Sequence, residues 1–231
     1  MKIFAISDLH LPGSLDKTMD MFGLRWQGHW DKIKQDWLAK VSDEDVVLIA
    51  GDISWAMHLK DAVPDLLDIS ALPGKKILIR GNHDFWWSGP TKVRSVLPEN
   101  MFILQNDAIK IGSCVFAGTR GWMDTNTPED KKIFARETIR LDLTLSAAQK
   151  LMDEDSTLYM MLHYPPVLSH TRFNEFCPVM EKFGVKYCIF GHLHGVSPQE
   201  AEITENNGIT YVLTSCDMIG FALKQIGEEN G

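Results

Sequence analysis

Ionisable and amide side chains follow five short apolar runs of this sequence, at 2–7, 46–51, 76–81, 158–162 and 187–191. The residues in these positions are Asp8 and His10, then Asp52, then Asn82, His83 and Asp84, then His163, and finally His192 and His194. Taken singly, an Asp or Asn after a strand is usually a turn residue. However, five of the eight histidines fall at the same kind of position, which indicates a shared site.

The donor types in this set indicate a metal centre. Oxygen and imidazole ligands without thiolate suit Mn²⁺, Fe, Zn²⁺ or Co²⁺. Seven of these residues are candidate ligands, namely Asp8, His10, Asp52, Asn82, His163, His192 and His194. Seven ligands are too many for one such ion, so we expect two divalent cations. Two metals about 3.5 to 4 Å apart can hold a hydroxide nucleophile and clamp a transferring phosphoryl group.

The apolar runs themselves predict the elements that position these side chains. Continuous apolar runs of this length are typical of parallel strands that are covered on both faces in an α/β sheet. Ligands of such sheets bind at the carboxyl ends of the strands. We therefore expect the five runs to deliver their polar residues to one rim.

Other segments predict helices and a second sheet. Helical spacing occurs at 37–41 and at 129–153. Thr127 with Pro128 is a good helix start, and Ser146 with Gln149 forms a second capping box, so the latter stretch is one helix or two. Segments 107–118, 209–213 and 221–226 predict strands of a second sheet packed on the first.

Composition predicts one domain spanning residues 1–231, with 45% apolar residues. The net charge is −8 and basic residues form no run, which disfavours binding to nucleic acid. The four cysteines lack CxxC spacing, so we expect them to be reduced and buried. The N-terminal run is too short for a signal peptide or a membrane span, which predicts a cytoplasmic protein with no membrane partner.

The ordered motifs resemble those of the calcineurin-like metallophosphoesterase superfamily. Its series is DxH, GD, GNH followed by an acid, an isolated H, and GHxH. The same series runs here from Asp8 to His194, with Gly51–Asp52, Gly81–Asp84 and His163 between. The resemblance implies a four-layer αββα sandwich of two packed mixed sheets flanked by helices.

The resemblance also implies roles for individual residues. Asp8, His10 and His194 would bind one metal, and Asn82, His163 and His192 the other. Asp52 would bridge the two metals. His83 would lie outside the ligand set, where it would protonate the leaving oxygen or stabilise charge on the phosphoryl group, or it would be a structural residue. The implied activity is metal-dependent hydrolysis of a phosphodiester or phosphomonoester by in-line attack of a metal-bridging hydroxide.

Residues around the motifs are candidates for substrate binding: Asn82, Arg120, Arg172, Trp55 and Trp86. Six tryptophans fall in predicted loops, at positions 26, 30, 55, 86, 87 and 122. They form an aromatic wall beside the metals or cap the core. Residues 11–30 lack a clear element and form a lid or a short helix.

Acidic charge and tryptophan-rich loops favour a small phosphorylated substrate such as a nucleotide. A nuclease of the same superfamily is an alternative, although it would need a basic groove. A catalytically silent scaffold, which the retromer subunit of the superfamily resembles, is disfavoured by the complete ligand set. The Ser/Thr protein phosphatase branch carries an acid and an Arg soon after the GD pair, whereas Ile53, Ser54 and Trp55 follow here.

Overall fold

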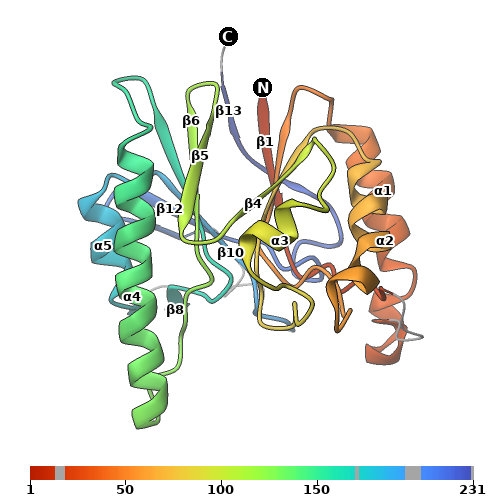
Figure 1. Ribbon diagram of the computed structural model, residues 1–231, viewed down its shortest axis with the longest axis horizontal. Helices are drawn as coiled ribbons and strands as arrows, with labels where there is room; N and C mark the ends of the chain where they lie inside the picture. The colour runs from red at the N-terminus through yellow and green to blue at the C-terminus, as the bar shows by residue number, and fades with distance from the viewer. Residues whose placement is uncertain (14–18, 170–171, 196–203, 230–231) are drawn as a thin grey trace.

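Two mixed β-sheets pack face to face in the computed structural model, which describes residues 1–13, 19–169, 172–195 and 204–229 (Figure 1). The first sheet has the order β13-β1-β2-β3-β4. Its strands are β1 (Lys2–Ile6), β2 (Val46–Ile49), β3 (Lys75–Ile79), β4 (Met101–Leu104) and β13 (Lys224–Glu228). Strands β1 to β4 are parallel, and β13 pairs with β1 in the antiparallel direction.

The second sheet has the order β11-β12-β10-β7-β6-β5. Its strands are β5 (Asp107–Ile111), β6 (Cys114–Gly118), β7 (Thr157–Met161), β10 (Tyr187–Phe190), β11 (Thr204–Asn206) and β12 (Ile209–Leu213). The four central strands are parallel, whereas the edge strands β5 and β11 are antiparallel. A small separate hairpin joins β8 (Val167–Ser169) to β9 (Arg172–Phe173).

Helices cover the outer faces of both sheets (Figure 1). The first sheet carries α1 (His29–Lys40), α2 (Leu59–Ser70) and the short α3 (Pro90–Arg94), and the second carries α4 (Pro128–Gln149) and α5 (Phe176–Lys182). One apolar cluster lies under each helical layer, and a third lies between the sheets, where Leu48 and Ile77 meet Phe116 and Met161. The predicted αββα sandwich is therefore confirmed.

Strand assignment to the sheets differs from the prediction in one respect. The C-terminal segment, expected near 221–226 in the second sheet, forms β13 beside β1 in the first sheet. The five strands that precede the motif residues are also divided, because β1, β2 and β3 lie in the first sheet and β7 and β10 in the second. The motif residues therefore meet where the carboxyl ends of two sheets come together.

The long stretch after Thr127 is one helix. Thr127 caps the N-terminus of this helix. The Thr127 side chain accepts from the Asp130 backbone amide, and the Asp130 side chain accepts from the Thr127 backbone amide. Ser146 lies inside the helix, so the predicted second capping box is wrong. The buried face continues through Leu141, Leu145 and Ala148, and this packing keeps the chain helical past Ser146.

All four cysteines are free and buried, as predicted. The described part of the 11–30 stretch contains two short 3₁₀ helices, Met19–Phe22 and Leu24–Trp26, and residues 14–18 lie outside the described ranges. Among the described residues, no helix combines the length and the apolar character needed to span a bilayer.

Candidate metal centre

The turns that follow β1, β2 and β10 hold their polar residues in left-handed backbone conformations. The φ angles are 58° at Asp8, 53° at Asp52 and 72° at His192. Such a φ costs a residue with a Cβ about 1–2 kcal/mol. Strain of this kind is tolerated where the surrounding structure determines it, which is typical of functional sites.

Glycines in the ligand loops allow the close approach that the turns require. A Cβ added at Gly81 would overlap the carboxylate and amide of Asp52, and one added at Gly191 would overlap Ser7 and the Asp8 carboxylate. The Gly in the GD, GNH and GHxH motifs thus brings neighbouring ligand loops into contact.

Asp8, His10 and His194 form one group of converging donor atoms. His10 Nε2 lies 3.4 Å from His194 Nε2, which lies 3.3 Å from Asp8 Oδ1. Ligand atoms about 2.1 Å from a tetrahedral cation are roughly 3.4 Å apart. The spacing of the three donors therefore fits a shared cation.

Asn82, His163 and His192 form the second group. Asn82 Oδ1 lies 2.7 Å from His163 Nε2 and 2.9 Å from His192 Nδ1. Asp52 lies between the groups, with its Oδ2 3.5 Å from His163 Nε2 and 3.8 Å from His10 Nε2. Donor atoms of Asp8, Asp52 and His163 also lie within 4.8 Å of one another. The structure thus brings all seven predicted ligands together.

Hydrogen bonds behind the donors orient them. His163 Nδ1 donates to the Ala50 carbonyl at 2.9 Å, which leaves the Nε2 lone pair facing the centre. His194 Nδ1 lies 2.9 Å from Asp217 Oδ1. Ser7 Oγ donates to Asp8 Oδ2 at 2.5 Å.

The Asp84 side chain connects the loop that follows β2 to the loop that follows β3. Its fully buried carboxylate accepts five hydrogen bonds, from the backbone amides of Asp52, Ile53, Ser54 and Gly81 and from Trp86 Nε1. Burial raises the pKa of Asp84, and the bonds from Gly81 and its neighbours oppose this. All five groups are donors, so the carboxylate form fits the site.

Two of the histidine pKa values suit ligands that must be neutral. Burial lowers the pKa of His10 to about 3 and that of His192 to about 4, so both rings are neutral at pH 7. Burial also acts to lower the pKa of His194, but its hydrogen bonds to Asp217 and Asp8 raise it to about 10. Without a cation, His194 therefore carries the positive charge that faces Asp8.

The pKa values of Asp8 and Asp52 are shifted in opposite directions. Burial acts to raise the pKa of Asp8, yet the hydrogen bond and charge of His194 hold it well below its usual range. Burial raises the pKa of Asp52 to about 7; His163 opposes the shift and the Asp8 and Asp84 carboxylates add to it. A centre that needs charge compensation at both carboxylates is suited to divalent cations.

An apolar cavity of about 290 Å³ opens beside His10, His192 and His194. Trp55 stacks on His10, with ring centroids 4.6 Å apart, and Trp26 lies 5.7 Å from His194. These two tryptophans form an aromatic wall, with Met19 and Phe22 alongside.

The other tryptophans are placed elsewhere. Trp86 and Trp87 are buried in the core, where Trp86 bonds to Asp84, so Trp86 does not line the cavity. Trp30 was expected in a loop but is the second residue of α1, and Trp122 packs on Tyr164.

His83 and the arginines occupy different sides of the centre. The His83 amide donates to Asp52 Oδ1 at 2.8 Å, and its ring lines the apolar cavity 4.7 Å from Trp55. Arg120 lies on the opposite side, with its guanidinium 5.5 Å from the Trp122 ring centroid. The side chain of Arg172 lies outside the described part of the chain.

Asp217 is a site residue that the motif series misses. It bonds to His194, and its other oxygen lies 3.7 Å from Arg25. Asp217 comes shortly after β12, so the rule that located the ligands, polar residues after a strand, also applies to it.

Comparison with known proteins agrees with this geometry. A family model described as calcineurin-like phosphoesterase matches residues 1–196. The chain belongs to the calcineurin-like phosphoesterase family. A crystal structure of the protein of unknown function AQ665 from Aquifex aeolicus has the same fold. The TM-score is 0.53 at 16% identity, over 97% of this chain and 95% of that one. Among curated proteins, none matches the sequence significantly.

Calcineurin-like phosphoesterases hydrolyse phosphoric esters with the help of bound metal, which makes this chain a metal-dependent hydrolase. The site fits that chemistry, since its donors are oxygen and imidazole and the spacing of one triad matches a shared cation. Asp8 belongs to two candidate ligand groups, one with His10 and His194 and the other with Asp52 and His163. These groups lie at the carboxyl ends of the central strands, as expected for an α/β fold.

Proposed function

We propose that the chain hydrolyses a phosphoester of a small phosphorylated molecule at a centre of two divalent cations. One observation carries the proposal: Asp52 Oδ2 faces both donor groups, 3.8 Å from His10 Nε2 and 3.5 Å from His163 Nε2. A carboxylate oxygen between two sets of ligands supports two adjacent cations that share it.

The residues divide into two ligand sets around Asp52. Asp8, His10 and His194 would hold one cation, and Asn82, His163 and His192 the other. Their oxygen and nitrogen donors suit Mn²⁺, Fe, Zn²⁺ or Co²⁺. When bound, the cations lower the pKa of coordinated water towards neutrality and neutralise charge on the phosphoryl group.

The chain's own groups would bind the substrate and transfer the proton. The backbone amide of His83 donates a hydrogen bond to Asp52 Oδ1, and the His83 ring lines the apolar cavity, where the leaving group would lie. From there the ring would donate a proton to the leaving oxygen. Trp55 and Trp26 supply apolar surface for the leaving group and exclude water from it.

The first test is hydrolysis by the metal-stripped protein of bis(p-nitrophenyl) phosphate and p-nitrophenyl phosphate, with each metal added in turn. We expect turnover only with metal, and its loss in Asp52→Asn. The ratio of diester to monoester rates narrows the substrate class. Hydrolysis that continues in chelator would refute the proposal.

The role of His83 has a separate test. A proton donor matters most when the leaving group is a poor one, because p-nitrophenolate departs without protonation. His83→Gln should therefore slow release of an alkoxide or phenoxide by about 10²-fold or more, and of p-nitrophenolate much less. An equal loss with both leaving groups would assign His83 a structural role.

A further inference from the structure

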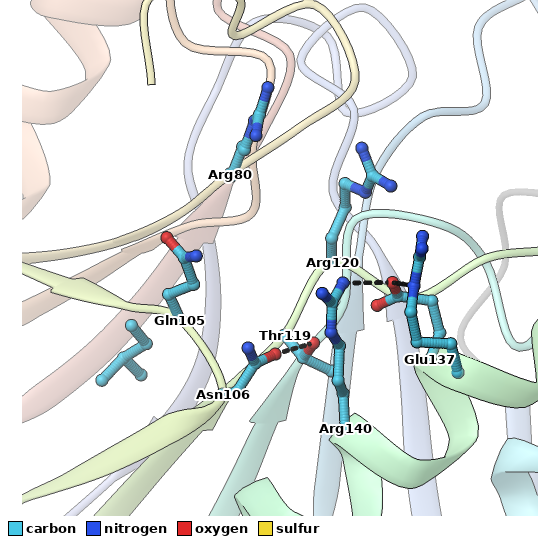
Figure 2. Close-up of a pocket in the computed structure, with 9 residues that line it drawn as sticks. Arg80, Gln105, Asn106, Thr119, Arg120, Glu137 and Arg140 are labelled. Atoms are coloured by element: carbon cyan, nitrogen blue, oxygen red, sulfur yellow. Dashed lines mark hydrogen bonds and ion pairs between the residues drawn. The ribbon is translucent and has the colours of Figure 1, made fainter. Parts of the chain in front are cut away.

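A second cavity lies against the other side of the metal centre and gathers four arginines. It has a volume of about 270 Å³ and is called here the arginine cavity; its charged lining is Arg80, Arg120, Arg136, Arg140 and Glu137. Figure 2 shows Arg80 and Arg120 side by side in the upper part of the view, with Asn106 and Arg140 below them. Four guanidinium groups and one carboxylate leave a surplus of three positive charges, in a protein whose net charge is −8.

Two of these arginines form no ion pair with a described residue. Arg136 and Arg140 share the buried Glu137, with Arg140 Nη1 2.6 Å and Arg136 Nε 3.7 Å from its Oε1. Within the described residues, no carboxylate forms an ion pair with Arg80 or Arg120, and the buried Nε of Arg80 has no hydrogen-bond partner. Buried polar donors are normally satisfied, so the unpaired Nε of Arg80 indicates a missing acceptor.

Electrostatics supports an anion in this position. Arg80 and Arg120 line the same cavity. Two like charges that line one cavity repel each other, and an anion between them would relieve this repulsion. Thr119 Oγ1 donates to Asn106 Oδ1 at 2.8 Å, which leaves the amide group of Asn106 as a further donor. Planar guanidinium groups bind phosphate in a bidentate manner.

Residues of the arginine cavity are adjacent to metal-centre residues along the backbone or hydrogen-bonded to them through it. Arg80 is separated from Asn82 by Gly81 alone. The Arg120 carbonyl accepts from the amides of His163 and Tyr164 at 3.0 and 3.1 Å. Arg80 follows β3 and Arg120 follows β6, whereas the aromatic wall belongs to the loops after β1 and β2. In the order β1-β2-β3-β4, an anion in the arginine cavity would therefore lie on the β3–β4 side of the centre, away from the aromatic wall.

We propose that the arginine cavity binds a second phosphate group of the substrate, so that the natural substrates are small molecules with two phosphates close together. This inference rests on the proposed function, because the first phosphate is the one hydrolysed at the metal centre. On one side of the metal centre, the apolar cavity would take the leaving group. On the other side, the arginine cavity would hold the second phosphate, which is not hydrolysed.

The first arm of the test compares two chromogenic compounds that differ only in this phosphate. Thymidine 5′-(p-nitrophenyl phosphate) is assayed with and without a 3′-phosphate, using the metal-loaded protein. We expect kcat/KM to be about 10-fold or more higher with the 3′-phosphate, the worth of one or more charge-assisted hydrogen bonds. In Arg120→Gln the ratio should fall towards one, and Lys150→Gln, an exposed charge at the far end of α4, should keep it.

The second arm measures binding of inorganic phosphate to the full-length protein in chelator, by calorimetry. Chelation removes the cations that would otherwise bind phosphate, so binding reports the arginine cavity. We expect one phosphate per chain, weakened about 10-fold or more in Arg120→Gln.

Each outcome decides between the two proposals. Absence of phosphate binding in chelator would overturn the arginine cavity as an anion site, whatever the kinetics. Binding together with equal kcat/KM for both compounds would overturn the substrate assignment and leave a site for free phosphate. If neither compound nor any other phosphoester is hydrolysed with metal, the proposed function fails, and the binding arm still decides whether the cavity holds phosphate.

Discussion

Asp84 offers the sharpest test of how the centre is held together. In Asp84→Asn, one carboxylate oxygen becomes an NH₂ group, which cannot accept. Oδ2 accepts from Asp52 and Gly81, at 2.9 and 2.8 Å, and Oδ1 accepts from Ile53, Ser54 and Trp86. The amide would keep the three bonds at Oδ1 and lose the two at Oδ2.

The cost follows from the two donors left unpaired. A buried donor without a partner costs about 1–3 kcal/mol, so the two together cost roughly 2–6 kcal/mol. Burial raises the pKa of Asp84, so removing its buried charge offsets part of this cost. We therefore expect the free energy of unfolding to fall by about 2–4 kcal/mol. That is a large part of the ~5–15 kcal/mol that stabilises a typical domain.

The assay is urea unfolding of the metal-free protein in chelator, so that metal binding does not contribute to stability. Asp142→Asn is the matched control, because Asp142 is exposed on α4 and the same substitution there should change stability by no more than about 0.5 kcal/mol. A loss below about 1 kcal/mol in Asp84→Asn, with an unchanged m-value, would refute the count of lost hydrogen bonds.

Three further predictions concern the ligands and their support. Asp217→Asn removes the carboxylate that orients the His194 ring and should weaken metal affinity about 10–100-fold in a competition titration with a chelator; unchanged affinity would contradict this role. The pKa of about 10 means that free His194 holds a proton at pH 7, and Asp52, with a pKa of about 7, holds part of another. Metal binding must release these protons, so affinity should rise with pH, and calorimetry in two buffers of different ionisation enthalpy should detect the release. Gly81→Ala forces a Cβ onto Asp52 and should cost about 1–3 kcal/mol in thermal or urea unfolding, whereas Gly89→Ala, with open space at its Cβ, should not.

The ligand series could be predicted from the sequence because each member follows a local rule. A continuous apolar run predicts a buried strand, and a polar residue directly after it lies at the rim where such folds bind ligands. Asp8, Asp52 and His192 all obey this rule, and the structure adds that each adopts a left-handed φ that aims its side chain into the centre.

Residues away from the motifs were less predictable. Trp55 and Trp86 both closely follow a motif, yet Trp55 stacks on His10 while Trp86 is buried against Asp84. Their sequence surroundings are alike, and only the path of each loop across the core decides which ring faces the cavity. Ser146 resembles a helix start in sequence, but the buried face of α4 continues through it.

The sequence by itself therefore indicated the donor types of the centre, because they depend on residue type and order, and the resemblance of its ordered motifs to a known family implied the four layers. Only the tertiary structure decided which sheet each strand joins, since strand partners are chosen by contacts between distant segments. The arginine cavity shows the same limit. Arg80, Arg120, Arg136 and Arg140 form no basic run in the sequence, and they meet only because β3, β6 and α4 end or pass at one edge of the two packed sheets.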